Sequence, residues 1–414
     1  MQFRRRSIAV AASVLALSLA VASCSSSKTS SGGSGSGDAP SGPIKIGVLS
    51  DTVNALAFFG QEANKGWDVA LDAIKSKVAG RSVQYVKAQC STPAECTTAT
   101  DKLIREDKVN LIMGTPGSAL ALAISQEAAR LGKVYFETAS LANNLLPGGD
   151  AKFIFRGSYS STIQSKDAVQ ALQDVYKQAG KDFSTAKILL VNEGSAANHD
   201  SAQVQKQLLE GMGIKLLGDE EYDVKSVDFG ALASKIVAQK PDVLLETSYI
   251  PDGVSLNKQL AARNFKAGVI HLIDGAASPK DQLAGNGAQY LETTLQVGYP
   301  GLDIKTDAMT NFNTEYKARF HAAPESGFPL TYYTSARILF DVLEQAKGKT
   351  DPASFKAATL AIDKPIGAYA NGWGAKFDST GQNTRALAAI QQWQGGKVCT
   401  VLPAQFASCQ LKLG

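Results

Sequence analysis

The chain has 414 residues, of which 44% are hydrophobic and 19% are charged, and its formal net charge at pH 7 is +4. Three of the excess positive charges are arginines among the first six residues, so the rest of the chain carries only about +1. This balance excludes a strongly basic surface, and we expect no nucleic acid partner. The length is more than one hydrophobic core usually supports, which predicts two lobes.

The N-terminal segment has the features of a bacterial export signal. Three arginines, Arg4 to Arg6, precede an apolar stretch from Ile8 to Ala20, which is too short to be a good membrane span. The next four residues, Val21 to Cys24, place small residues ahead of a cysteine and resemble a lipobox. We therefore expect residues 1–23 to be a lipoprotein signal peptide. Cys24 would then carry the lipid that anchors the protein at the extracytoplasmic face of the cell membrane.

The composition of residues 24–43 predicts a flexible tether. From Ser25 to Pro43 the sequence reads SSSKTSSGGSGSGDAPSGP, which has too little apolar content to offset the entropy of ordering it. The string GSGSG follows no predicted strand, so it does not indicate a phosphate-binding loop. The tether would hold the folded part of the protein away from the membrane.

The first part of the folded chain alternates strand and helix patterns. Residues Ile44 to Ser50 form an apolar run with β-branched members and predict a strand. Helical spacing follows at Trp67, Ala70, Leu71, Ile74 and Val78. A second unit comprises a predicted strand, Val109 to Met113, a helix from Ser118 to Leu131 that ends at Gly132, and a strand from Val134 to Phe136.

The same alternation returns in the second part of the chain. Predicted strands lie near residues 188–191, 214–217, 243–245 and 269–273, with helical patterns between them. Such alternation predicts parallel sheets covered by helices, whose ligands bind beyond the carboxyl ends of the strands. Residues 385–403 predict two more strands joined at Gly395 and Gly396, a hairpin that could extend the second sheet.

Four further cysteines occur in two close pairs, Cys90 with Cys96 and Cys399 with Cys409. In an exported protein, such pairs predict two local disulfides. The alternative is a zinc site. It would need all four thiols to converge from distant parts of the chain without CxxC spacing, and we expect no metal.

Several blocks of the sequence occur in a characteristic order: IKIGVLSDTVNALAFFGQEANKGWDVALDAI, DKLIREDKVNLIMGTPGSALALAISQEAARLGKVYFETAS, FIFRGSYSS, IDGAASP and WGAKFDSTGQNTRALAAIQQWQGGKVCTVLP. Together they resemble the periplasmic binding protein type 1 family, in the branch of the leucine/isoleucine/valine-binding protein. The resemblance implies an α/β fold of two Rossmann-like lobes with parallel sheets, joined by a hinge of three crossovers. The N-terminal lobe would comprise residues 44–159 and 297–384, and the C-terminal lobe residues 160–296 and 385–414.

The resemblance also implies a function. A protein of this family captures a small polar ligand, here an amino acid or a related compound, in a cleft that closes over it. It delivers the ligand to the permease of an ABC transporter, needs no cofactor and acts as a monomer. The alternative with the same fold is a receptor that senses the ligand and signals to a membrane partner. An enzyme is not expected, because the sequence has no HExxH, GxSxG, Walker or CxxC motif.

Four ligand-binding residues follow from positions that match the family. Phe59, with Phe58 beside it, would lie over the ligand, and Tyr249 would face it from the second lobe. Ser118 stands at a predicted helix start, where its hydroxyl and the adjacent amides could bind a carboxylate, although it could be only a helix cap. Asp274 aligns with the acid that receives the ammonium group of amino-acid ligands. As alternatives, Phe59 could fill its own lobe's core and Asp274 could form a turn.

Other positions depart from the amino-acid binders. Ala139 and Leu141 lie where these carry a threonine, and Leu141 aligns with it directly. Asn198 and its small neighbours replace a tyrosine, and the adjacent His199 could donate a hydrogen bond to a ligand. We therefore expect a reshaped pocket without branched-chain specificity, in which recognition of a carboxylate and an ammonium group is retained.

Overall fold

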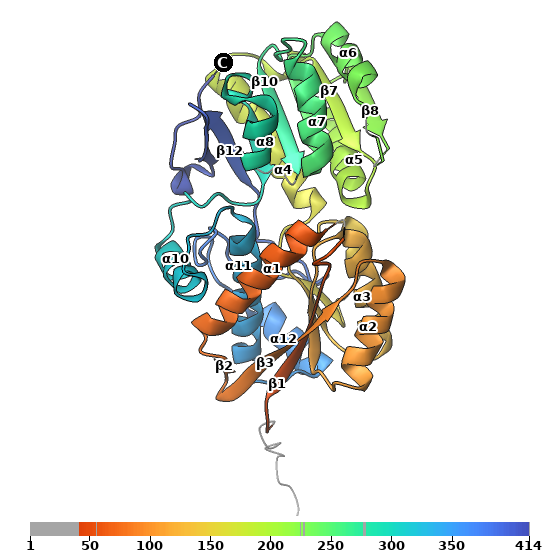
Figure 1. Cartoon of the computed structure of the whole chain (residues 1–414), viewed down its shortest axis with the longest axis vertical. Coiled ribbons are helices and arrows are strands. Elements are labelled where there is room, and N and C mark those ends of the chain that lie inside the picture. The colour runs from red at the N-terminus through yellow and green to blue at the C-terminus, as the bar shows by residue number, and fades with distance from the viewer. Residues whose placement is uncertain (1–40, 55, 224, 227, 276–278, 414) are drawn as a thin grey trace, which may run out of the picture. The chain divides into compact units, whose positions relative to one another are not determined.

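The computed structural model describes residues 41–54, 56–223, 225–226, 228–275 and 279–413. The predicted signal peptide, Cys24 and the tether up to residue 40 lie outside the described residues. Among those described, no helix combines the length and the apolar character needed to cross a membrane. The strands form two sheets, each flanked by helices (Figure 1).

The first sheet has six strands in the order β2-β3-β1-β4-β5-β6. All neighbouring pairs are parallel except β2 with β3, and Val48 of β1 lies opposite Lys87 of β3 and Met113 of β4. The strands are β1 (Ile44–Ser50), β2 (Lys77–Val78), β3 (Arg81–Gln89), β4 (Leu111–Gly114), β5 (Tyr135–Glu137) and β6 (Ile154–Arg156). The carboxyl ends of the parallel strands therefore meet at one edge of the sheet.

The second sheet has seven strands in the order β13-β12-β11-β10-β9-β7-β8. The pairs from β11 to β8 are parallel, and the hairpin β12-β13 adds antiparallel strands beside β11. The strands are β7 (Ile188–Glu193), β8 (Gly218–Tyr222), β9 (Val243–Ser248), β10 (Ile270–Gly275), β11 (Leu295–Gly298), β12 (Ala389–Gln394) and β13 (Lys397–Leu402).

Helices cover both faces of each sheet because successive strand residues face opposite sides. In the first sheet, Val48 and Met113 pack in the core with α1 and α11, whereas Leu49 and Ile112 pack with α2 and α3. We call this sheet and its helices the first lobe: α1 (Ala57–Ala73), α2 (Pro93–Arg105), α3 (Ser118–Arg130), α10 (Asp307–Phe320), α11 (Phe328–Gln345) and α12 (Pro352–Ala361).

The second lobe is built in the same way. Its sheet is covered by α4 (Ser161–Gln178), α5 (Ala196–Gly211), α6 (Gly230–Gln239), α7 (Ile250–Ala261), α8 (Pro279–Asn286) and α9 (Ala288–Leu291). The chain passes between the lobes three times, after β6, after β11 and before β12, as the resemblance implied. Both lobes belong to one unit, residues 39–414.

Most predicted strands and the hairpin at Gly395 and Gly396 are confirmed, but two expectations were wrong. Residues 214–217 were expected to form a strand, but the strand β8 begins only at Gly218. Ile214 is apolar because it packs in the core from the turn that follows α5. The sequence of β8, GDEEY, is polar because β8 is an edge strand. Val78 belongs to β2, because the left-handed residues Lys75 and Ser76 reverse the chain after α1.

Both predicted disulfides are present. Cys90 pairs with Cys96 at a Cα separation of 5.0 Å, and Cys399 pairs with Cys409 at 5.9 Å. The zinc alternative is thereby excluded for these cysteines. No cluster of His, Cys, Asp and Glu side chains suited to a metal ion occurs within the described parts of the chain.

The contact between helices α1 and α11 of the first lobe depends on a glycine. A Cβ atom at Gly66 of α1 would lie 2.3 Å from the carbonyl oxygen of Pro329 in α11, and the ring of the next residue, Trp67, packs edge-on against Tyr332 at 5.7 Å. The two helices can approach this closely only where no side chain intervenes.

We expect Gly66→Ala to lower the free energy of unfolding by about 1–3 kcal/mol, because the new methyl group meets backbone atoms. Gly211 is the matched control, since it ends α5 and has open space around it. Gly211→Ala should leave stability unchanged or raise it by up to about 1 kcal/mol. Urea unfolding of both variants measures the difference, and equal effects would refute the proposed contact.

Candidate functional site

A small cavity of about 40 Å³ lies where the loops of both lobes meet. It brings together six of the seven residues expected to bind a ligand: Phe59, Ser118, Ala139, Leu141, Asn198 and Tyr249. The other lining residues are Leu56, Pro116, Gly117, Ser140, Tyr159, Gln164, Ala197 and Tyr299. Most of these follow the carboxyl ends of parallel strands, as expected for ligand sites in open sheets.

Ser118 begins helix α3 at the wall of the cavity. It is not the N-cap, because that position belongs to Gly117, whose φ is +96° and whose Cβ would lie 2.3 Å from Leu56. The Ser118 hydroxyl accepts a hydrogen bond from the N–H of Ala142 at 3.2 Å and keeps its own proton to donate. Since the first N–H groups of a helix lack intrahelical partners, a carboxylate could bind here.

Glu137 fixes the loop that carries Ala139 and Ser140. Its Oε1 accepts hydrogen bonds from the N–H groups of Thr138, Ala139 and Ser140 at 2.6, 2.7 and 2.8 Å, and its Oε2 accepts one from the Tyr135 hydroxyl. Burial raises the pKa of Glu137 to about 7. This fully buried carboxyl group therefore orders the backbone of the cavity wall.

Arg156 holds the other end of the same loop. Its guanidinium donates to the carbonyl oxygens of Leu141 at 3.2 Å and Ala142 at 2.5 Å. Burial lowers the pKa of Arg156 to about 10. Glu137 and Arg156 were not predicted from the sequence, although each is a charged residue that ends a short apolar strand, which is an unusual composition for a buried strand.

In the second lobe, Glu193 at the end of β7 positions Asn198. Its Oε2 accepts a hydrogen bond from Asn198 Nδ2 at 2.7 Å, and its Oε1 accepts one from the N–H of Ser195 at 2.9 Å. Asn198 lies in the first turn of α5. His199 does not line the cavity; its side chain is half exposed and pairs with Glu221 at 2.6 Å.

Four aromatic rings surround the cavity, from Phe59, Tyr159, Tyr249 and Tyr299. The centroids of Phe59 and Tyr249, from opposite lobes, are 6.4 Å apart, and those of Tyr159 and Tyr299 are 6.3 Å apart. Tyr159 and Tyr299 were not predicted from the sequence. Tyr159 lies shortly after β6 and Tyr299 directly follows β11, each at a crossover between the lobes, and that position was the available signal.

Asp274 is the expected site residue that does not reach the cavity. It is fully buried at the end of β10, and the side-chain amides of Gln164 and Gln205 donate to its two oxygens. Burial raises the pKa of Asp274 to about 7. Gln164 of α4 lines the cavity in place of Asp274.

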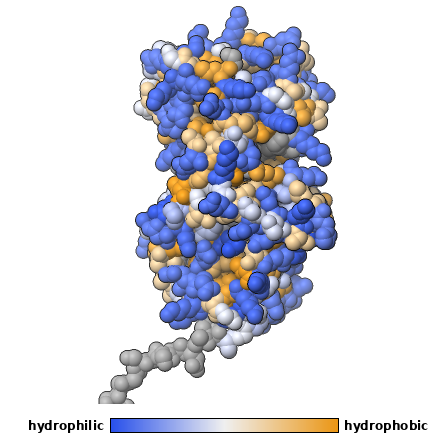
Figure 2. Space-filling view, turned by 90° about the vertical axis from the view of Figure 1, so that its left-hand side faces the viewer, coloured by the Kyte–Doolittle hydropathy of each residue, from blue (hydrophilic) through white to orange (hydrophobic). Residues whose placement is uncertain are grey.

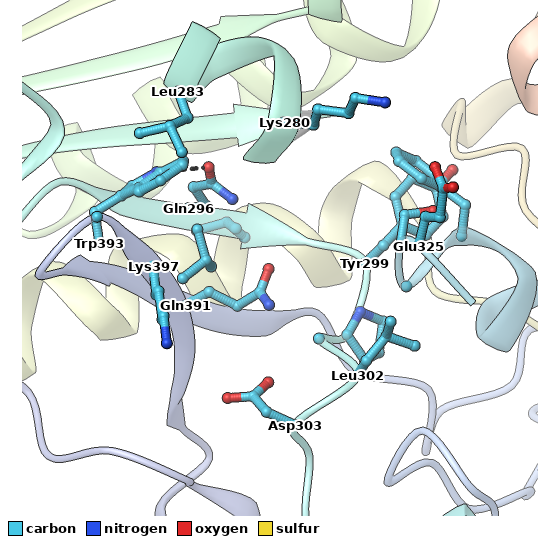
Figure 3. Close-up of a pocket in the computed structure, with 18 residues that line it drawn as sticks. Lys280, Leu283, Gln296, Tyr299, Leu302, Asp303, Glu325, Gln391, Trp393 and Lys397 are labelled. Atoms are coloured by element: carbon cyan, nitrogen blue, oxygen red, sulfur yellow. Dashed lines mark hydrogen bonds between the residues drawn. The ribbon is translucent and has the colours of Figure 1, made fainter. Parts of the chain in front are cut away.

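A second, larger hollow of about 410 Å³ shares only Tyr299 with the cavity among the described residues that line them. Figure 3 shows Gln296 and Gln391 pointing into this hollow, and Trp393 Nε1 donates to Gln296 Oε1 at 2.8 Å. The hollow is lined by α8, the segments 299–303 and 325–328, and the hairpin β12-β13. Figure 2 shows the side of the molecule on which β12 lies, where hydrophobic residues gather between hydrophilic regions. None of the seven expected ligand residues lines it.

The pKa values of the buried carboxyl groups determine how stability depends on pH. The ordinary pKa values are 4.5 for Glu137 and 3.8 for Asp274, and both rise to about 7 in the folded protein. Between these values the folded state keeps protons that the unfolded chain has lost, so stability falls as pH rises through this range. We expect the melting temperature to be higher at pH 5 than at pH 8.

Glu137→Gln is the control for this prediction, because its amide oxygen can still accept from the loop N–H groups but the side chain cannot titrate. The difference in melting temperature between pH 5 and pH 8 should be smaller in this variant than in the unchanged protein. A melting temperature that rises from pH 5 to pH 8 would contradict the raised pKa values. Identical pH profiles for both proteins would show that Glu137 does not contribute to the pH dependence.

Comparison with known proteins agrees with this architecture. The family model described as periplasmic binding protein matches residues 43–397. A Leu/Ile/Val-binding protein homolog 7 of Brucella suis biovar 1 (strain 1330) is 29% identical over 379 residues, which cover 90% of this chain and 94% of that protein.

Two solved structures show the same fold. A leucine-binding protein of Thermotoga maritima MSB8 has a TM-score of 0.73 at 20% identity and covers 86% of this chain and 97% of its own. An ABC transporter solute-binding protein of R. palustris, in complex with benzoate, has a TM-score of 0.72 at 19% identity. The match covers 89% of this chain and 98% of that protein's chain. The chain therefore belongs to the periplasmic binding protein family, a family of solute-binding proteins rather than enzymes.

Proposed function

We propose that this protein is an extracytoplasmic solute-binding lipoprotein that captures a small ligand between its lobes and delivers it to an ABC transporter. The observation that carries the proposal is the cavity, whose wall combines strand-end loops of both lobes with two crossover tyrosines. The family match and the named solute-binding relatives support the same role.

Capture would proceed by lobe closure. The lobes already contact each other beside the cavity, where the N–H of Asn143 donates to Asp200 Oδ2 at 2.7 Å. A ligand that touches Ser118 in the first lobe and Tyr249 in the second would add contacts available only when the lobes are together. Because these contacts are absent in an open form, the ligand would shift the population toward the closed form.

The lining residues favour a monocarboxylate with a flat apolar body. The start of α3 at Ser118 offers hydrogen-bond donors for the carboxylate, and four aromatic rings offer packing for the rest of the ligand. None of the described lining residues is charged, so an ammonium group would lack a carboxylate partner. The benzoate complex of the R. palustris protein supports an aromatic acid, whereas the Brucella and Thermotoga relatives are named for branched-chain amino acids.

A thermal-shift screen with benzoates, aliphatic acids and amino acids tests the binding role, since a ligand that binds only the folded protein raises its melting temperature. We expect aromatic acids to give the largest shift. Ser118→Ala and Tyr249→Ala should each weaken binding of the best ligand by about tenfold, because each removes a direct contact. Ser234→Ala, at an exposed position of α6, is the control. Unchanged affinity in both cavity variants would place the binding site elsewhere.

The lipid anchor has a separate test in cells. Cys24→Ser should release the protein from the membrane fraction and abolish incorporation of labelled fatty acid, because a hydroxyl cannot form the thioether bond. Cys90→Ser is the control, since it changes a disulfide cysteine and leaves Cys24 intact. Membrane retention of Cys24→Ser would refute the anchor. Uptake of the identified ligand would then be compared in cells with and without the protein. Loss of uptake without the protein supports transport, and unchanged uptake supports sensing.

A further inference from the structure

Gln164 lies between the cavity and a buried carboxylate. It belongs to the first turn of α4 and is 1% exposed, and it lines the cavity. Its Nε2 donates to Asp274 Oδ1, while Nε2 of Gln205, on α5, donates to Asp274 Oδ2. The two amides thus clamp the same carboxylate from two helices.

An ionised carboxylate can only accept hydrogen bonds, so both amides must present their NH₂ groups to Asp274. Their oxygens then point elsewhere, and Gln164 Oε1 and Gln205 Oε1 are both buried without a hydrogen-bond partner. A buried polar atom without a partner costs free energy, which a ligand can recover by supplying that partner. Gln164 Oε1 belongs to a lining residue, whereas Gln205 is outside the lining.

We propose that Asp274 is a positioning residue that locks the Gln164 amide with its oxygen available to the ligand, so that the site selects carboxylates carrying a hydrogen-bond donor. This inference rests on the solute-binding function proposed above and specifies the ligand further. The donor is a neutral group such as a hydroxyl, because no charged side chain lines the cavity among the described residues.

The hydroxyl of Tyr159 is a second buried atom without a partner in the cavity wall. A tyrosine hydroxyl both donates and accepts, so it accommodates either kind of ligand atom and does not discriminate between them. The locked amide of Gln164 offers a ligand only its oxygen, which can accept a hydrogen bond but not donate one. Discrimination between a hydroxyl and a group of similar size without a proton should therefore depend on Gln164 and Asp274.

The test uses calorimetric titration of the full-length protein with 3- and 4-hydroxybenzoate and with 3- and 4-fluorobenzoate at pH 8, above the raised pKa of Asp274. Fluorine occupies similar space but donates no proton. We expect a hydroxybenzoate to bind about tenfold more tightly than its fluoro counterpart, the effect of leaving one buried acceptor unpaired.

Two variants attribute this preference to the proposed pair. In Asp274→Asn the new amide can accept from one glutamine and donate to the other, so Gln164 is free to turn over and the preference should fall to about threefold or less. Gln164→Met removes the acceptor itself and should abolish the preference. Asp167→Asn is the control, because Asp167 is a half-buried carboxylate of α4 that accepts a hydrogen bond from the N–H of Ala388 and none from Gln164. It should keep the tenfold ratio.

Each outcome has a definite consequence. A preference that falls to about threefold or less in Asp274→Asn, disappears in Gln164→Met and survives in Asp167→Asn supports the inference. A tenfold preference that persists in Asp274→Asn overturns the positioning role of Asp274. Equal binding of hydroxy- and fluorobenzoates by the unchanged protein, or a preference that persists in Gln164→Met, overturns it while solute binding stands. If none of the four compounds binds, the inference is overturned for this ligand class, and the thermal-shift screen shows whether the binding function itself fails. Melting temperatures confirm that each variant is folded.

Discussion

Buried carboxylates at the carboxyl ends of parallel strands hold together the loops that form the cavity. Glu137 at the end of β5 accepts hydrogen bonds from three successive backbone N–H groups, and Glu193 at the end of β7 fixes Ser195 and Asn198. Asp51 after β1 does the same for the N–H groups of Val53, Asn54 and Leu56. Loops with free backbone amides would otherwise need water or regular structure to satisfy them, so these acids allow irregular chain to be both buried and rigid.

These hydrogen bonds to buried carboxylates also fix the conformation of the loops in the cavity wall. A carboxyl group that accepts from consecutive amides fixes their directions, and the neighbouring side chains are fixed with them. Leu56 and Ala139 therefore face the cavity from loops rather than from helices or strands. Burying the acids costs desolvation free energy, which is why the pKa values of Glu137 and Asp274 rise toward neutrality. Part of the stability is given up so that the loops have one conformation.

The crossover tyrosines connect the cavity to the hinge. Tyr159 follows the first crossover strand and packs on Trp373 at 5.7 Å, and Tyr299 follows the second and packs on Phe328 at 4.7 Å. A ligand that contacts these rings touches the segments that must change direction when the lobes move apart. Binding and lobe closure would therefore be coupled through the same side chains, without a separate signal path.

Much of the fold could be predicted from the sequence, because strand and helix patterns are local. The runs at Ile44 to Ser50 and Val243 to Leu245, the helix start at Ser118 and the glycine turn of the last hairpin all depend on neighbours along the chain. The strand expected at 214–217 failed because its apolar residues pack from a turn while the true edge strand is polar. An edge strand carries little of the buried pattern on which such predictions depend.

Only part of the candidate site could be predicted from the sequence. A family resemblance located Phe59, Ser118, Ala139, Leu141, Asn198 and Tyr249, which the structure brings to one cavity. It could not show that Gln164 stands in front of Asp274, or that Tyr159 and Tyr299 complete the wall, since these relations join segments more than a hundred residues apart. By itself the sequence determined the elements and the strand-end loops. Which side chains of those loops reach the cavity was decided by tertiary packing, because burial and hydrogen-bond partners depend on chain segments that only folding brings together.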